Sequence, residues 1–212
     1  MTEQIAGIPI PDTRLVADAT EVIRESEPPL LFHHSRRVYL FGMLQARRLG
    51  LRPDSELLYV GAMFHDLGLT EAYGASMQRF EVDGADAARE FLTGHGIEHD
   101  AAQGIWTAIA LHTTPGIPEH MAPEIAMVTA GVETDVLGFG YHDLDRADIE
   151  AVVAAHPRPD FKRQILAAFT HGFAHRPDST FGTVNADVLA HYAPGFTRTD
   201  FVEVILGNPW AE

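Results

Sequence analysis

One apolar stretch constrains the fold of this chain more than any other feature. Residues 60–68 (Val-Gly-Ala-Met-Phe-His-Asp-Leu-Gly) form a hydrophobic run that ends in the adjacent pair His65 and Asp66. The residues before the pair, from Asp54 to Phe64, read as a helix with little polar surface, so the pair is expected at the end of a buried helix. Removing an imidazole and a carboxylate from water costs free energy, and a divalent cation is the partner that would offset that cost for both groups.

Composition narrows both the metal chemistry and the class of partner. The 212 residues include no cysteine, so a metal site must be built from His, Asp and Glu. A formal charge of −15 argues against nucleic acid or an anionic membrane as partner, and a small-molecule substrate is expected instead. No apolar segment is long enough to span a membrane and the first residues do not resemble a secretory signal, so we expect a cytoplasmic protein.

Apolar residues recur at helical spacing along the chain, which predicts an all-α single domain over residues 1–212 without convincing strands. Capping signals mark helix boundaries: Asp12-Thr13 before the first helix, Gly50 after the second, and Asp83 before a helix near its middle. We expect a metal-binding core at about residues 30–143 and a C-terminal helical extension at about residues 144–212.

The second expected helix, residues 30–49, contains two adjacent histidines, and helical periodicity separates them. His34 shares its face with the apolar residues and should point into the core. His33 lies on the side of Arg36 and Arg37 and should face outward or lie at the rim. The alternative explanation of His34 is a core histidine that bonds only to a carbonyl group.

Two more polar groups are expected at buried positions. Asp135 lies on the apolar side of the helix that begins at Pro123, and an isolated carboxylate there is unusual unless it is paired or binds a cation. His112 follows a buried helix and precedes Thr113, and the two form a polar cluster that suits a pocket wall. Alternatively, Thr113 could merely form hydrogen bonds with the backbone of its loop. Four of these side chains together could bind one divalent ion: His34, His65, Asp66 and Asp135. Two imidazoles and two carboxylates suit Zn²⁺, Fe²⁺, Mn²⁺, Co²⁺ or Ni²⁺ and leave coordination positions open for water.

The ordered pattern His34…His65-Asp66…Asp135 resembles the HD-domain superfamily of helical, metal-dependent enzymes, which most often act as phosphohydrolases. Segments that resemble the cyanamide-hydratase branch are His34–Tyr39, Phe80–Ala85 and Ile109–Thr113. That branch binds zinc and adds water across a nitrile to give urea from cyanamide. The resemblance therefore implies an HD-type helical bundle with a mononuclear site, in which zinc is the expected ion.

Two departures from the phosphohydrolase pattern bear on the substrate and on the number of metal ions. Many HD phosphohydrolases carry a lysine soon after the His-Asp pair, where this chain has Leu69, and its only lysine is Lys162. Dinuclear members supply two more histidines between the pair and the last aspartate. His112 could be one of them, but residues 81–84 contain no histidine. Glu81 or Asp83 could take the place of the second histidine, but a mononuclear site is the simpler expectation.

The resemblance and the residue types together suggest roles for individual side chains. The candidates for proton transfer and catalysis are Asp66, Glu81, Asp83 and His112. The candidates for substrate binding are Thr113, which would orient a small polar substrate, and Arg37 and Arg79, which would clamp a phosphate ester. The alternative from another class is a ligand-sensing HD module, and apolar positions in the C-terminal part could form a homo-oligomer surface.

Overall fold

The computed structural model describes residues 3–210, and the regular secondary structure of these residues is helical apart from one very short hairpin. β1 (Gln4–Ile5) and β2 (Ile8–Pro9) pair in antiparallel register with Ile5 opposite Ile8. The prediction of an all-α fold is confirmed, and the hairpin is the one departure from it within these residues.

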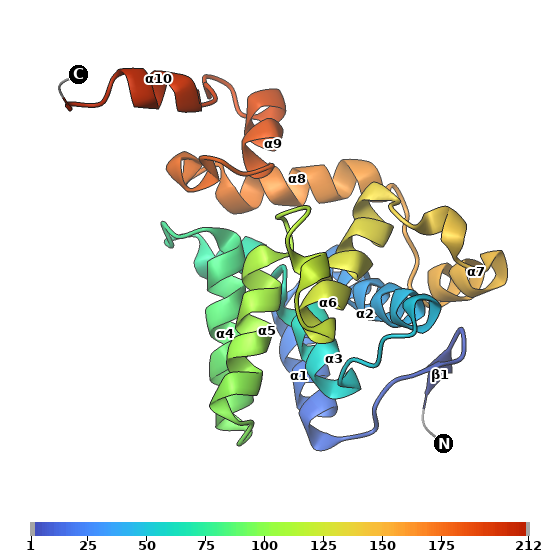
Figure 1. The fold of residues 1–212 in the computed structure, drawn as a ribbon. Helices are drawn as coiled ribbons and strands as arrows, with labels where there is room; N and C mark the ends of the chain where they lie inside the picture. Colours follow the sequence, from blue (N-terminus) through green and yellow to red (C-terminus); the bar gives the residue numbers. More distant parts are fainter. Residues whose placement is uncertain (1–2, 211–212) are drawn as a thin grey trace.

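The helices follow one another along the whole chain (Figure 1). Their bounds are α1 (Arg14–Ser26), α2 (Pro29–Leu49), α3 (Ser55–Phe64), α4 (Phe80–Gly94), α5 (His99–Leu111), α6 (Pro123–Val132), α7 (Arg146–Ala155), α8 (Phe161–Phe173), α9 (Asn185–Tyr192) and α10 (Phe201–Leu206). Shorter turns include the 3₁₀ helices η1 (Leu67–Leu69) and η2 (Glu71–Tyr73), and a single π-helical turn, η4 (Glu133–Leu137), that directly follows α6.

Local capping chemistry sets several helix ends. The Thr13 side chain accepts a bond from the Val16 N–H at the start of α1, and Gly50 ends α2 with a φ of 70°. The prediction that Asp83 caps a helix is wrong, because α4 already begins at Phe80 and Asp83 lies in its first turn. Asp83 is buried there because it forms an ion pair with Arg176.

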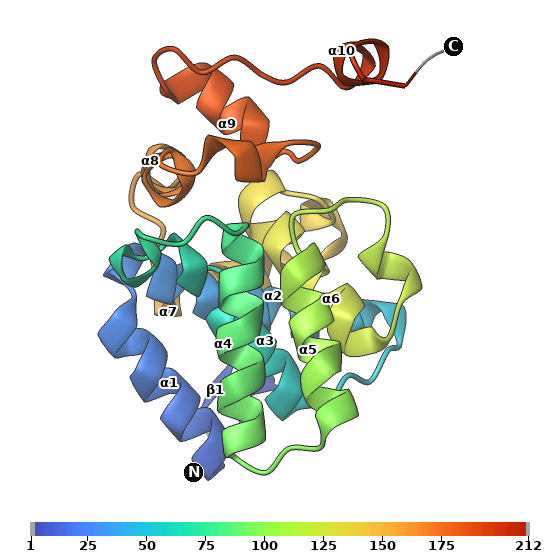
Figure 2. The same ribbon diagram turned by 90° about the vertical axis from the view of Figure 1, so that its left-hand side faces the viewer.

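α2 runs through the centre of the molecule, with α3 and α6 packed against it and α4 beside α5 (Figures 1 and 2). The contact between α2 and α6 is close because α6 presents Gly131 to it. A Cβ at Gly131 would lie 2.2 Å from the backbone oxygen of Val38. Since helices surround α2, it has almost no solvent face over residues 34–42, where every residue is buried.

The C-terminal helices lie beyond this bundle. α8 packs against η1, and α9 packs against α8. α10 stands away from the remainder of the molecule, and all six of its residues are exposed (Figure 2). Within residues 3–210, no helix combines the length and the apolar character needed to cross a membrane.

Candidate metal centre

Helix ends bring the candidate ligands together. His65 and Asp66 directly follow α3, His112 directly follows α5, and His34 projects from the first half of α2. All four side chains are buried, and none is more than 3% exposed. The four side chains therefore meet in the interior, because the helices that carry them or end beside them are apolar and buried.

His34, His65 and Asp66 form a group whose ligand atoms lie close enough together to hold one metal ion. The Nε2 atoms of His34 and His65 are 3.2 Å apart, and Asp66 Oδ2 lies 3.3 Å from His65 Nε2 and 3.6 Å from His34 Nε2. His112 lies near the other oxygen of Asp66, with its Nε2 3.6 Å from Oδ1.

Hydrogen bonds on the far side of each ring fix which nitrogen faces the cluster. His65 Nδ1 lies 2.8 Å from the Ala62 carbonyl oxygen, and His112 Nδ1 lies 2.6 Å from that of Ile109. His34 Nδ1 lies 2.7 Å from Asp135 Oδ2. These oxygens only accept, so each Nδ1 carries the proton and each Nε2 presents a lone pair to the cluster.

The donor set fits a divalent cation. Both oxygens of Asp66 are buried and have no hydrogen-bond partner. Burial raises the pKa of Asp66, but the surrounding histidines, His65 first, hold it well below its usual range, so the carboxylate stays ionised. Lone pairs and a negative charge that converge without a donor repel one another, and a bound cation removes that repulsion.

Asp135 approaches the cluster but is not part of the metal-binding group. Its Oδ2 contacts His34 Nδ1, and its two oxygens lie 2.9 Å and 2.8 Å from Arg37 Nε and Nη2. Arg158 Nε lies 2.9 Å from Asp135 Oδ1. Burial raises the pKa of Asp135, whereas the bonds to His34 and Arg37 lower it below its ordinary value. Asp135 therefore orients the His34 ring, and its role as a direct ligand of the ion stays a prediction.

A model of the HD domain family matches residues 31–156, which is more than half of the chain. The chain belongs to the HD domain family. HD domains bind divalent metals and are generally metal-dependent hydrolases, so this HD protein is a metal-dependent enzyme of the hydrolase type. The match names no branch of the family, and no curated protein matches the chain.

Arg37 of this HD domain is buried, contrary to the prediction that it lies on an outward side of its helix. Its guanidinium bonds to Asp135 and, through Nη1, to the carbonyl oxygens of His156 and Pro157, each at 3.1 Å. The prediction failed because periodicity assumes one solvent face, which α2 lacks. A side chain with these partners is not free to clamp a phosphate, so the geometry does not support that role.

Glu81 and Asp83 are each held in place by an arginine. Buried Glu81 accepts bonds from Arg79 at 2.8 Å and from Asn185 at 2.9 Å, and Thr113 also donates to it. Burial raises the pKa of Glu81, but Arg79, His112 and Thr113 together lower it below its ordinary value. Asp83 pairs with buried Arg176 in the same way, and the roles of both carboxylates in proton transfer stay predictions.

Sequence reasoning missed the groups that hold these side chains. Arg158, Arg176 and Asn185 lie C-terminal to the predicted core, and no local pattern marks them. A further missed group is Glu27, which follows α1 and is only 6% exposed. The only signal for Glu27 was an acidic residue at a helix break, which is ordinarily a solvated position.

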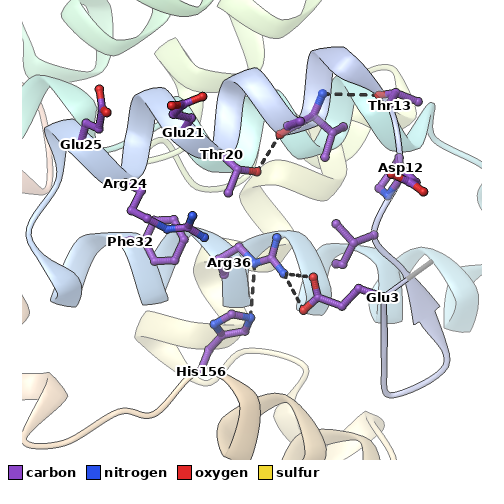
Figure 3. Close-up of a pocket in the computed structure, with 14 residues that line it drawn as sticks. Glu3, Asp12, Thr13, Thr20, Glu21, Arg24, Glu25, Phe32, Arg36 and His156 are labelled. Atoms are coloured by element: carbon purple, nitrogen blue, oxygen red, sulfur yellow. Dashed lines mark hydrogen bonds and ion pairs between the residues drawn. The ribbon is translucent and has the colours of Figure 1, made fainter. Parts of the chain in front are cut away.

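One sizeable cavity of this HD protein lies away from the histidine cluster. It measures about 780 Å³ and lies among the N-terminal hairpin, α1 and α2 (Figure 3). Its floor contains buried Arg36, whose Nε donates to His156 Nε2 at 3.3 Å and whose Nη2 contacts Glu3. A smaller cavity of about 280 Å³ is lined by Asp135, Arg158 and Lys162 among others, so it shares Asp135 with the metal centre.

Proposed function

We propose that the protein uses a divalent ion, preferably zinc, to activate water and add it to a small uncharged nitrile such as cyanamide, giving urea. The observation that carries this proposal is the pairing of the arginines around the cluster with buried carboxylates: Arg37 and Arg158 with Asp135, Arg79 with Glu81, and Arg176 with Asp83. Phosphate dianions are bound by cationic groups that remain free for them. Paired arginines favour a substrate without charge.

His34, His65 and Asp66 are the residues that would hold the ion, which when bound lowers the pKa of water toward neutrality. His112 is the group best placed to move protons, because its Nε2 lone pair faces Asp66 while its proton sits on Nδ1. As the water oxygen bonds to the nitrile carbon, His112 accepts a proton from the water. It then returns a proton to the nitrile nitrogen, which receives the displaced π electrons, and tautomerisation gives urea.

Thr113 provides the polar wall for the substrate. Its hydroxyl donates to Glu81 and accepts from Arg79 Nη2 at 3.3 Å, so its orientation is fixed. The remaining acceptor capacity of Thr113 and Glu81 suits the amino group of cyanamide. Arg79 therefore serves to hold this wall and not to bind a phosphate.

A specific observation favours phosphate-ester hydrolysis as the second candidate. The cavity beside Asp135 is lined by Arg158 and by Lys162, the only lysine of the chain. Lys162 is exposed and makes no ion pair among residues 3–210, so it is free to meet a phosphate.

The two candidates are separated by parallel assays of protein whose metal content is known. We expect urea formation from cyanamide in proportion to metal occupancy, and no phosphate release from a panel of nucleotides. Phosphate release without urea would transfer the activity to the second candidate. A protein that binds no metal and is inactive in both assays would be the ligand-sensing module.

His112→Gln tests the proton-transfer role. Because Gln keeps a polar side chain but cannot accept a proton and return it, kcat for urea formation should fall about 10²–10⁴-fold while metal content is retained. His120→Gln is the matched control, since the His120 side chain is 79% exposed. A kcat within about twofold of wild type for His112→Gln would remove His112 from the reaction.

A further inference from the structure

Buried Arg36 of α2 has one anionic partner among residues 3–210. Its Nη1 donates to the Tyr59 hydroxyl at 2.6 Å and its Nε to His156 Nε2 at 3.3 Å, and neither of these acceptors supplies negative charge. Its Nη2 contacts both carboxylate oxygens of Glu3, at 3.1 and 3.2 Å. A buried guanidinium is costly without a counter-charge, and here Glu3 provides it.

The Glu3 carboxylate is easily replaced. Its side chain is 58% exposed, whereas that of Arg36 is 6% exposed. Glu3 directly precedes β1, and the hairpin of β1 and β2 has only two residues in each strand. So short a hairpin contributes little stability of its own. A free carboxylate can therefore take the place of Glu3 on Arg36 without disturbing the helical core.

The cavity beside this ion pair has the size and the lining of a small-molecule site. It measures about 780 Å³, and its apolar wall includes Ile10, Val16 and Phe32. Figure 3 shows Arg24 of α1 and Arg36 of α2 reaching into the space between the two helices. The guanidinium of exposed Arg24 lies 5.0 Å from the centre of the Phe32 ring and forms no ion pair among residues 3–210. The cavity therefore combines an apolar wall, a buried cation and a second, free cation.

Acidic residues of the cavity wall limit the charge of its ligand. Asp12, Glu21 and Glu25 line the cavity and are exposed. Water and salt screen exposed charges, so these carboxylates act only weakly on a single negative charge that contacts buried Arg36. They oppose an anion with two or more charges, such as phosphate. The chemistry of the wall thus favours a monoanion with an apolar body.

We propose that this cavity binds a small monocarboxylate with an apolar body. The carboxylate replaces Glu3 on Arg36, and the apolar part packs against Phe32 beside the Arg24 guanidinium. In the structure, the Glu3 carboxylate already occupies the position that the ligand carboxylate would take. This binding site lies away from the histidine cluster and does not depend on the proposed reaction.

Calorimetric titration of the metal-loaded, 212-residue chain with phenylacetate tests the inference. Phenylacetamide, which has the same shape without the charge, is the matched control ligand. We expect saturable binding of phenylacetate, at least about fivefold weaker binding of phenylacetamide, and no competition by inorganic phosphate. Absence of saturable binding, equal affinity for the two probes, or competition by phosphate would overturn the inference.

Variants locate the bound phenylacetate. Glu3→Gln removes the competing carboxylate, so it should bind phenylacetate about two- to fivefold more tightly than wild type. Glu119→Gln is the matched control, because the Glu119 side chain is also 58% exposed and the change in net charge is the same. Arg24→Gln should bind phenylacetate about two- to tenfold more weakly. Affinity of Glu3→Gln no higher than that of Glu119→Gln, or unchanged affinity of Arg24→Gln, would contradict the assignment.

One more variant separates this cavity from the metal centre, since a carboxylate can also bind a metal ion. Asp66→Asn removes a charge from the cluster that would hold the ion but leaves the cavity unchanged. It should therefore bind phenylacetate as wild type does. Loss of phenylacetate binding in folded Asp66→Asn would place the ligand at the metal centre and overturn the inference.

Discussion

At the scale of single residues, hydrogen bonds link the metal centre to the large cavity. Asp135 holds the His34 ring and is itself held by Arg37, which bonds to the backbone oxygen of His156. The His156 ring in turn accepts from Arg36 on the cavity floor (Figure 3). His156 therefore contacts two adjacent arginines of α2, Arg36 through its ring and Arg37 through its backbone oxygen.

The buried His156 ring predicts a specific dependence of stability on pH. Burial, and then the positive charge of Arg36 with smaller effects of His33 and Arg37, lowers its pKa to about 3. In the unfolded chain the histidine pKa is about 6.5. Below that pH the unfolded chain takes up a proton on His156, whereas the folded protein keeps this ring neutral. The free energy of unfolding should therefore fall by up to about 1.4 kcal/mol per pH unit between about pH 6.5 and 3.

Urea titrations at pH 7 and pH 5 test this prediction when wild type is compared with His156→Gln. The variant lacks the titrating ring, so its loss of stability between the two pH values should be smaller by roughly one to two kcal/mol. Equal losses in both proteins would mean that His156 does not exclude the proton in the folded state.

At the scale of elements, the contact of α6 with α2 depends on the absence of a side chain at Gly131. Gly131→Ala would place a Cβ 2.2 Å from the Val38 oxygen, so the helices must move apart. We expect a loss of about 1–3 kcal/mol in the free energy of unfolding, measured in urea. Gly104→Ala is the control in α5, where nothing lies within 4 Å of the added Cβ. Helix propensity should make Gly104→Ala more stable by about 0.5–1 kcal/mol, and equal effects at both sites would refute the packing argument.

Elements were largely predictable because their ends depend on local chemistry. Thr13, Asp54 and Gly50 bound helices where the sequence indicates, and the apolar run before His65 forms a buried helix as expected. Distant partners were not predictable. Nothing near Arg37 in the sequence indicates that Asp135 meets it, and the π-helical turn that carries Asp135 departs from the regular helix on which its expected position was based.

At the scale of the whole molecule, the C-terminal part completes the centre. Arg176, after α8, donates to the backbone oxygens of Gly68 and Gln78 at 2.7 and 2.8 Å and pairs with Asp83. Asn185, at the start of α9, donates to Glu81. The cluster could be read from the sequence, since its members sit on apolar helix faces or at helix ends. The contacts by which Arg176 and Asn185 support the cluster could not be predicted, because they join residues about a hundred positions apart in the sequence.

Truncation separates the two parts of this extension. A chain that ends at Thr199 loses exposed α10 and should keep its unfolding free energy within about 0.5 kcal/mol and its affinity for Zn²⁺. A chain that ends at Ala174 also loses Arg176 and Asn185, so buried Asp83 is left unpaired, which costs about 3–5 kcal/mol. Urea unfolding of both truncated chains measures the difference, and equal stability would show that the extension does not support the core.

The central claim is that the buried histidine–carboxylate cluster holds a divalent ion, and elemental analysis tests it most directly. Purified protein and its Asp66→Asn variant would be loaded with Zn²⁺, freed of excess metal and analysed for bound ions per chain, with circular dichroism as the check on folding. The account predicts about one ion per chain for wild type and a small fraction of that for a folded Asp66→Asn variant. Wild-type protein without bound metal, or a variant that binds as much as wild type, would contradict it.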